Sequence, residues 1–133
     1  TYYNLIEKIN DIAGMRIVCT LKDDIFFIKD LVKQIPDIHI LNEKDYVTNP
    51  KPSGYSSYHM IVEVPVKLSQ KTIYVKCEIQ IRTLAMDFWA SFEHKVKYKT
   101  EQEVNKKTSK ELVNCAKMIS KFDDKMISLK NIQ

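Results

Sequence analysis

The stretch TIYVKCEIQIR, residues 72–82, alternates between apolar and polar side chains, and this pattern constrains the fold more than any other in the chain. Alternation of this kind is typical of a β-strand, because successive side chains on a strand point to opposite faces of the sheet. One face should pack in a core, and the other should face solvent or form the floor of a site. The apolar row is Ile73, Val75, Cys77, Ile79 and Ile81, and the polar row is Tyr74, Lys76, Glu78, Gln80 and Arg82.

The rest of the chain divides into further strands and helices. Strands are predicted at 15–20, 38–46 and 57–66, and helices at 1–12, 23–35, 84–98 and about 102–130. Asp23 or Asp24 is placed to cap the helix at 23–35, and Pro36 stops it. The sequence therefore predicts an α+β (mixed α/β) fold, with helices flanking a mixed sheet, in a single domain spanning 1–133.

Apolar side chains recur at helical spacing in three of these helices, and each set should form a buried stripe. These sets are Ile25, Ile28, Val32 and Ile35; Ala85, Trp89, Phe92 and Val96; and Leu112, Ala116, Ile119, Phe122, Met126 and Leu129.

Composition excludes several classes of protein. The chain is 44% hydrophobic and 29% charged, as in an ordinary globular domain, and no apolar run is long enough to span a membrane. The three cysteines show no paired spacing, which favours small buried side chains in a reducing cytoplasm. A formal net charge of +4 suits an anionic ligand such as a nucleotide, but it does not argue for DNA binding.

The two arginines each follow a carboxylate closely. Asp11 lies five residues before Arg16, and Glu78 lies four before Arg82. Guanidinium groups suit phosphate oxygens, and two carboxylates facing one magnesium ion are typical of phosphoryl-transfer sites. The alternative is that Asp11 is a solvated surface acid and that the polar row of the strand simply faces water.

The loop KPSGYSSYH, residues 51–59, concentrates side chains that can bind a nucleotide. Gly54 permits a tight turn, and the ring of Tyr55 could stack on a base. Lys51 can contact phosphate, and His59 starts the next strand. Taken singly, each residue also fits a hairpin-like loop with a packed tyrosine. His94, near the end of a helix, could likewise be a ligand contact or a surface residue.

Three segments together resemble one family. DIAGMRIVC (11–19), DYVTNPKPSGYSSYH (45–59) and EIQIRTLAMDFWASFEHKVKYK (78–99) are similar, in order and spacing, to the synthetase domain of the RelA/SpoT homologues. The small single-domain alarmone synthetases of Gram-positive bacteria are the most similar members. The resemblance implies a nucleotidyltransferase-like fold and the transfer of pyrophosphate from ATP to the 3′-hydroxyl of GTP or GDP, which makes the alarmone (p)ppGpp of the stringent response.

The resemblance also implies roles for single residues. Asp11 and Glu78 would bind Mg²⁺, and Glu78 could take the proton of the 3′-hydroxyl. Tyr55 would stack on guanine. The other substrate-binding positions implied are Lys51, Ser53, Gly54, His59, Arg16, Gln80, Arg82 and His94.

Two departures from the family leave alternatives open. Relatives carry basic residues that bind ATP before the point at which this sequence starts, so we expect the domain to lack its N-terminal segment. Ser53 is often asparagine in relatives, and Ser56 is often basic or amide-bearing, so the preference for the acceptor could differ. The alternatives are a non-catalytic guanine-nucleotide-binding domain and a toxin-like relative that acts on adenosine nucleotides or tRNA. Small relatives form tetramers, and the stripe of the last helix predicts a homo-oligomer here too.

Overall fold

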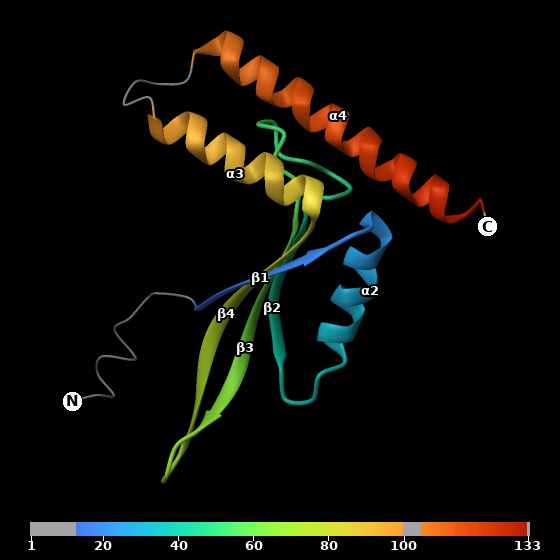
Figure 1. The fold of residues 1–133 in the computed structure, drawn as a ribbon. Coiled ribbons are helices and arrows are strands. Elements are labelled where there is room, and N and C mark those ends of the chain that lie inside the picture. Colours follow the sequence, from blue (N-terminus) through green and yellow to red (C-terminus); the bar gives the residue numbers. More distant parts are fainter. Residues whose placement is uncertain (1–12, 100–104, 133) are drawn as a thin grey trace.

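The computed structural model describes residues 13–99 and 105–132. Four strands form one sheet in the order β1-β4-β3-β2, with β1 parallel to β4 and the other neighbours antiparallel (Figure 1). The strands are β1 (Ala13–Cys19), β2 (His39–Asp45), β3 (Tyr58–Lys67) and β4 (Thr72–Thr83). The helices are α2 (Lys22–Lys33), α3 (Leu84–Lys99) and α4 (Lys106–Lys130). The predicted α+β class, with a mixed sheet and a long C-terminal helix, is confirmed.

The elements form a sheet with helices on one face and at one end. Figure 1 shows α2 alongside the sheet, whereas α3 and α4 lie together beyond one end of it, next to the loop between β2 and β3. The helix predicted for residues 1–12 lies outside the described residues. No helix in the described part of the chain is long and apolar enough to span a membrane.

The core lies between α2 and the apolar face of β3 and β4. Met60, Val62 and Ile81 are fully buried on the strands, and Ile25 is fully buried on the helix. Burial of each such side chain stabilises the fold by about 1.5–3 kcal/mol. The alternation predicted for residues 72–82 is confirmed, and it turns the polar row of β4 to the opposite face.

Helix α2 ends earlier than predicted. The carboxylate of Asp24 accepts a hydrogen bond from the backbone N–H of Leu21 (3.3 Å), so an aspartate does stabilise the start of this helix. The last helical residue is Lys33, however, and Ile35 is exposed, so its assignment to the buried face is wrong. The reason is that a residue before proline is disfavoured in the helical region, so the chain leaves the helix before Pro36.

The junction of β4 and α3 is anchored to α4 by a buried polar contact. The hydroxyl of Thr83 accepts from the backbone N–H of Met86 (3.1 Å) and donates to the carboxylate of Asp123 (2.8 Å). Asp123 is only 2% exposed, and its burial raises its pKa. Farther along, the indole N–H of buried Trp89 donates to the carbonyl of Leu112 (2.9 Å). These contacts hold α4 against the end of the sheet.

The predicted stripe of α4 divides between two faces. Leu112 is buried, but Phe122 is 54% exposed and Leu129 is also exposed, so the prediction of one buried stripe is wrong. The reason is geometric: four residues after Ile119, Asp123 returns to the inward face, so Phe122 turns outward. Phe92 of α3 and Cys115 of α4 were likewise expected to be buried and are exposed.

Candidate active site

The site residues of the sheet lie on its polar face, opposite the core. In the register, Glu78 of β4 stands beside Gly14 of β1, and Gln80 stands between Arg16 of β1 and His59 of β3. Directly paired residues of neighbouring strands point to the same face. The sheet therefore gathers side chains that are far apart in sequence around Glu78.

Two hollows meet at Glu78. The first, about 270 Å³, lies over β1 and includes Gly14, Arg16 and Gln80 in its wall. The second, about 280 Å³, lies over β2 and β3 and includes Lys51 and His59, with the other lining residues Asn42, Glu43, Lys44, Tyr46 and Ile61. The Glu78 side chain is 37% exposed and lines both hollows. A single carboxylate can therefore reach a molecule in each.

Two neighbours orient the Glu78 carboxylate through the same oxygen. Oε1 lies 3.4 Å from Nδ1 of His59 and accepts a hydrogen bond from Nε2 of Gln80 (3.3 Å). Burial lowers the pKa of His59, although the charge of Glu78 opposes this shift. A neutral imidazole that donates from Nδ1 to the carboxylate leaves Nε2 as an acceptor.

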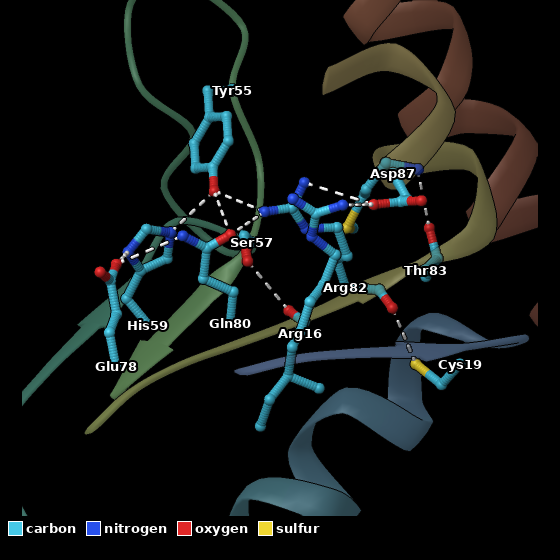
Figure 2. A network of polar contacts seen from close by, with 12 residues as sticks. Arg16, Cys19, Tyr55, Ser57, His59, Glu78, Gln80, Arg82, Thr83 and Asp87 are labelled. Atoms are coloured by element: carbon cyan, nitrogen blue, oxygen red, sulfur yellow. Dashed lines mark hydrogen bonds and ion pairs between the residues drawn. The ribbon is translucent and has the colours of Figure 1, made fainter. Parts of the chain in front are cut away.

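The hydroxyl of Tyr55 is the centre of a polar network (Figure 2). It lies 2.9 Å from Nε2 of His59, accepts from Nη2 of Arg82 (2.9 Å) and lies 3.4 Å from Oε1 of Gln80. The side chain is half-buried, and burial raises the pKa of its hydroxyl. Tyr55 therefore does not stand free, as a simple stacking platform would, because its hydroxyl is held from three sides.

The loop before β3 is ordered by hydrogen bonds that its own backbone N–H groups donate. Asp45, at the end of β2, accepts hydrogen bonds from the N–H groups of Val47 and Thr48, both at 2.9 Å. The Gly54 N–H donates to the carbonyl of Lys51 (2.8 Å), which closes a tight turn, and φ of Gly54 is +99°. The turn places the Lys51 ammonium 5.3 Å from the ring centre of Tyr55 and 4.9 Å from that of Tyr46.

Arg82 lies beneath the floor of the site. It is 3% exposed, and its Nη2 donates to both Tyr55 and Gln80. Its Nη1 lies 3.6 Å from Oδ1 of Asp87, and Arg16 approaches the same oxygen at 3.4 Å. Burial lowers the pKa of the Arg82 guanidinium. Asp87 was not predicted as a site residue, since its only signal in the sequence is an acid in the first turn of a helix, five residues after Arg82.

Three of the other predicted residues lie apart from the two hollows. Ser53 lines a different hollow with residues of α3 and α4, and Gly54 packs under Ala116 of α4. His94 is exposed on α3. Asp11, predicted as a catalytic residue that binds magnesium, lies outside the described residues. The roles predicted for these four residues, like those predicted for the other site residues, stay predictions.

The described residues offer part of a metal site. Among residues 13–99 and 105–132, no group of three or more His, Cys, Asp or Glu side chains could hold a metal ion by itself. Glu78 provides carboxylate oxygens, the ligands that Mg²⁺ prefers, at the point where the two hollows meet. Sites of this kind commonly use one or two carboxylates together with substrate phosphates, so Glu78 fits such a role.

The sequence matches a known family and a named relative. Residues 2–103 match the family described as "Region found in RelA / SpoT proteins". The chain is 48% identical over 124 residues to the GTP pyrophosphokinase YwaC of Bacillus subtilis, a match that covers 93% of this chain and 59% of YwaC. The chain thus spans less than two thirds of the length of this relative.

Solved structures from Bacillus subtilis share the fold. Small alarmone synthetase 2 superposes with a TM-score of 0.87 at 40% identity, over 98% of this chain and 77% of that one. Small alarmone synthetase 1 bound to its product pppGpp gives 0.87 at 36% identity, over 98% and 68%. The same synthetase bound to AMPCPP gives 0.74 at 32% identity, over 97% and 64%. The resemblance seen in the three sequence segments is confirmed, and the chain belongs to the RelA/SpoT family.

Proposed function

We propose that this chain is the catalytic core of a GTP pyrophosphokinase, which transfers pyrophosphate from ATP to the 3′-hydroxyl of GTP or GDP. The observation that carries the proposal is the position of Glu78 in the shared wall of two hollows. A transfer between two nucleotides requires two neighbouring binding sites, with a general base at their junction to accept the proton of the attacking hydroxyl. The name of YwaC, and the pppGpp and AMPCPP bound to small alarmone synthetase 1, support this chemistry.

The hollow over β2 and β3 suits the acceptor nucleotide. Lys51 supplies a cation for its phosphates, and its ammonium lies 5.3 Å from the ring centre of Tyr55. Stacking of guanine on this ring would displace Lys51 from its place between the two tyrosine rings toward the phosphates. Ser53, Gly54 and His94 complete the set that we assign to substrate binding by family position.

The hollow over β1 suits ATP. The Arg16 side chain is 56% exposed there and carries the positive charge that a triphosphate or its leaving group requires. Gln80 lines this hollow and donates one amide N–H to Glu78, which leaves the second N–H of the amide for a substrate.

Glu78 would act as the general base. In the reaction, the 3′-oxygen of the acceptor bonds to the β-phosphorus of ATP and the bond from that phosphorus to the oxygen bridging to the α-phosphate breaks, so AMP leaves. The proton of the 3′-hydroxyl passes to the Glu78 carboxylate. Mg²⁺ held by Glu78 and Asp11 would neutralise phosphate charge during this transfer.

Product analysis tests the proposal. The purified protein is incubated with Mg²⁺, labelled ATP and each of GTP, GDP, adenosine nucleotides and tRNA, and the products are separated by thin-layer chromatography. We expect label to move to GTP and GDP. Binding of GTP without turnover would instead identify a non-catalytic guanine-nucleotide-binding domain, and label on adenosine nucleotides or tRNA a toxin-like activity.

The outer face of α4 supports assembly with a second copy of the chain. Exposed apolar side chains recur along this helix and its end, namely Met118, Phe122, Leu129 and Ile132. Exposed apolar surface of this extent often marks an interface. We therefore propose a homo-oligomer, with a tetramer as the form expected from the family, acting in the cytoplasm where both nucleotides are available.

A further inference from the structure

The Arg82 guanidinium is the most deeply buried charge near the proposed site. Its Nε is buried and has no hydrogen-bond partner. Oδ1 of Asp87 is likewise buried without a hydrogen-bond partner, although the two side chains form an ion pair. Even when it is paired, a buried charge often stabilises a fold no more than well-packed apolar side chains of similar volume would. An arginine at this place is therefore a poor choice for stability alone.

The two substrate hollows do not account for Arg82 either. Both are lined by other residues, whereas the Arg82 side chain is 3% exposed and lies below Tyr55 and Gln80. The guanidinium provides several N–H donors in one fixed plane, so it can orient more than one acceptor at the same time.

Two paths of polar contacts lead from Arg82 to the same oxygen of Glu78. In the first, Nη2 of Arg82 donates to Oε1 of Gln80, which turns the Gln80 amide nitrogen toward Oε1 of Glu78 (3.3 Å). The amide group can make both contacts only in this orientation, since its oxygen accepts and its nitrogen donates.

The second path passes through Tyr55 and His59. Arg82 donates to the Tyr55 hydroxyl, so the proton of that hydroxyl is available to Nε2 of His59, 2.9 Å away. The imidazole then carries its own proton on Nδ1, which faces Oε1 of Glu78 at 3.4 Å. Both paths hold Oε1, which leaves Oε2 of Glu78 as the oxygen that meets the reacting hydroxyl.

We propose that Arg82 and Asp87 form a positioning pair, in which Asp87 neutralises the buried guanidinium and Arg82 orients Tyr55, Gln80 and, through them, Glu78. The inference rests on the proposed function for the role of Glu78. Arg82 is accordingly a positioning residue and not a phosphate ligand. Asp87 also holds Arg16 at 3.4 Å, so the pair connects the two hollows.

Double-mutant cycles in the purified protein test whether Arg82 acts through Tyr55. Arg82→Lys keeps the charge but removes the planar set of donors, and we expect kcat/KM to fall about tenfold to a hundredfold, the range for a hydrogen bond to a charged group. Tyr55→Phe removes the shared hydroxyl. If Arg82 acts through Tyr55, the double variant should be hardly worse than Arg82→Lys alone. Losses that multiply would overturn the proposal.

The acceptor series separates positioning from phosphate binding. A positioning role predicts the same fold-loss in Arg82→Lys for GTP, GDP and GMP, because no phosphate is contacted. A loss that grows with the number of phosphates contradicts the proposal. If Arg82→Lys fails a thermal-melt control for folding, Asp87→Asn takes its place in both tests. Asp87→Glu should recover part of what Asp87→Asn loses, and Asp124→Asn, which removes an exposed carboxylate paired with Lys22, should be neutral.

A spectroscopic measurement keeps the inference separate from the proposed activity. In protein labelled with 3-fluorotyrosine, the ¹⁹F signal of Tyr55 is identified by its loss in Tyr55→Phe. We expect this signal to shift in Arg82→Lys and Asp87→Asn but not in Asp124→Asn. An unmoved signal would overturn the positioning role even in an active enzyme. A shifted signal in a protein that makes no product would support the pair while the proposed function fails.

Discussion

Substitution of Gly54 by alanine should displace the loop that carries Lys51 and Tyr55. A Cβ at this position would lie 2.7 Å from Cβ of Ala116 and 3.2 Å from the ring of Trp89, and φ of Gly54 is +99°. Neither neighbour can move cheaply, because Cβ of Ala116 is bonded directly to the backbone of α4 and Trp89 is hydrogen-bonded to Leu112. The loop must therefore move away from the helix.

The expected cost has two parts. A left-handed backbone costs a residue with a Cβ about 1–2 kcal/mol. Overpacking against a rigid neighbour costs about 1–3 kcal/mol. We expect Gly54→Ala to lower the free energy of unfolding by about 2–5 kcal/mol in total.

Chemical denaturation of a small set of variants measures these two parts. Ala116→Gly should cost about 1 kcal/mol alone, as glycine does within a helix, but should return most of the overpacking part when combined with Gly54→Ala. Gly14→Ala is the matched control for stability, since a Cβ there meets no atom within 4 Å. We also expect Gly54→Ala to weaken GTP binding in calorimetry, because Lys51 and Tyr55 move with the loop. If Gly54→Ala changed the free energy of unfolding by less than about 0.5 kcal/mol, as a typical surface substitution does, the packing argument would be refuted.

Three further predictions follow from the geometry. Glu78→Gln should abolish pyrophosphate transfer while the affinity for GTP stays within a few-fold, because the carboxylate faces the junction of the hollows and not the guanine of the bound nucleotide. Asp123→Asn should keep the contact with Thr83 and remove a buried charge. Burial raises the pKa of Asp123 in the folded state. The stability of the wild type relative to the variant should therefore fall as pH rises from about 4 through that raised pKa. Phe122→Asp, on the outer face of α4, should reduce the size of the oligomer, whereas Ile119→Asp should destabilise the fold itself.

Each of these predictions has a clear contrary outcome. Substantial turnover by Glu78→Gln, in the labelled-product assay, would remove this residue from the mechanism. Parallel stability curves for the wild type and Asp123→Asn between pH 3 and pH 8 would show that Asp123 does not hold its proton more tightly when folded. Light scattering that finds a monomer before any mutation would end the proposal for α4.

Local patterns in the sequence determined the strands and the polar face of the site. The alternation in residues 72–82 specified which side chains of β4 enter the core, because a strand has only two faces. It therefore placed Glu78 and Gln80 on the same face of the strand. Gly54 was likewise recognisable as a turn residue. The two faces of the strand and the turn at Gly54 depend only on residues that are close in sequence, so the sequence alone is enough to predict them.

Helix burial could be predicted only in part. A helix presents its whole circumference, and which side becomes buried depends on where the neighbouring elements lie. The apolar residues of α4 were therefore predicted to form one buried stripe, whereas the structure places Leu112 and Asp123 on an inner face and Phe122 on an outer face. The early end of α2, which leaves Ile35 exposed, came from the conformational restriction before Pro36.

The network under the site was decided by the tertiary structure alone. Arg82 was expected on an open face because it continues the polar row of β4, but α3 and the loop that carries Tyr55 cover this end of the strand and bury it. Asp87 meets Arg16 from a position 71 residues later in the chain, and His59 meets Glu78 from another strand. No local pattern encodes such pairs, because they exist only once the sheet register has brought distant segments side by side. The sequence thus determined which groups are available for chemistry, and the fold determined which of them line the two hollows and which hold the others in place.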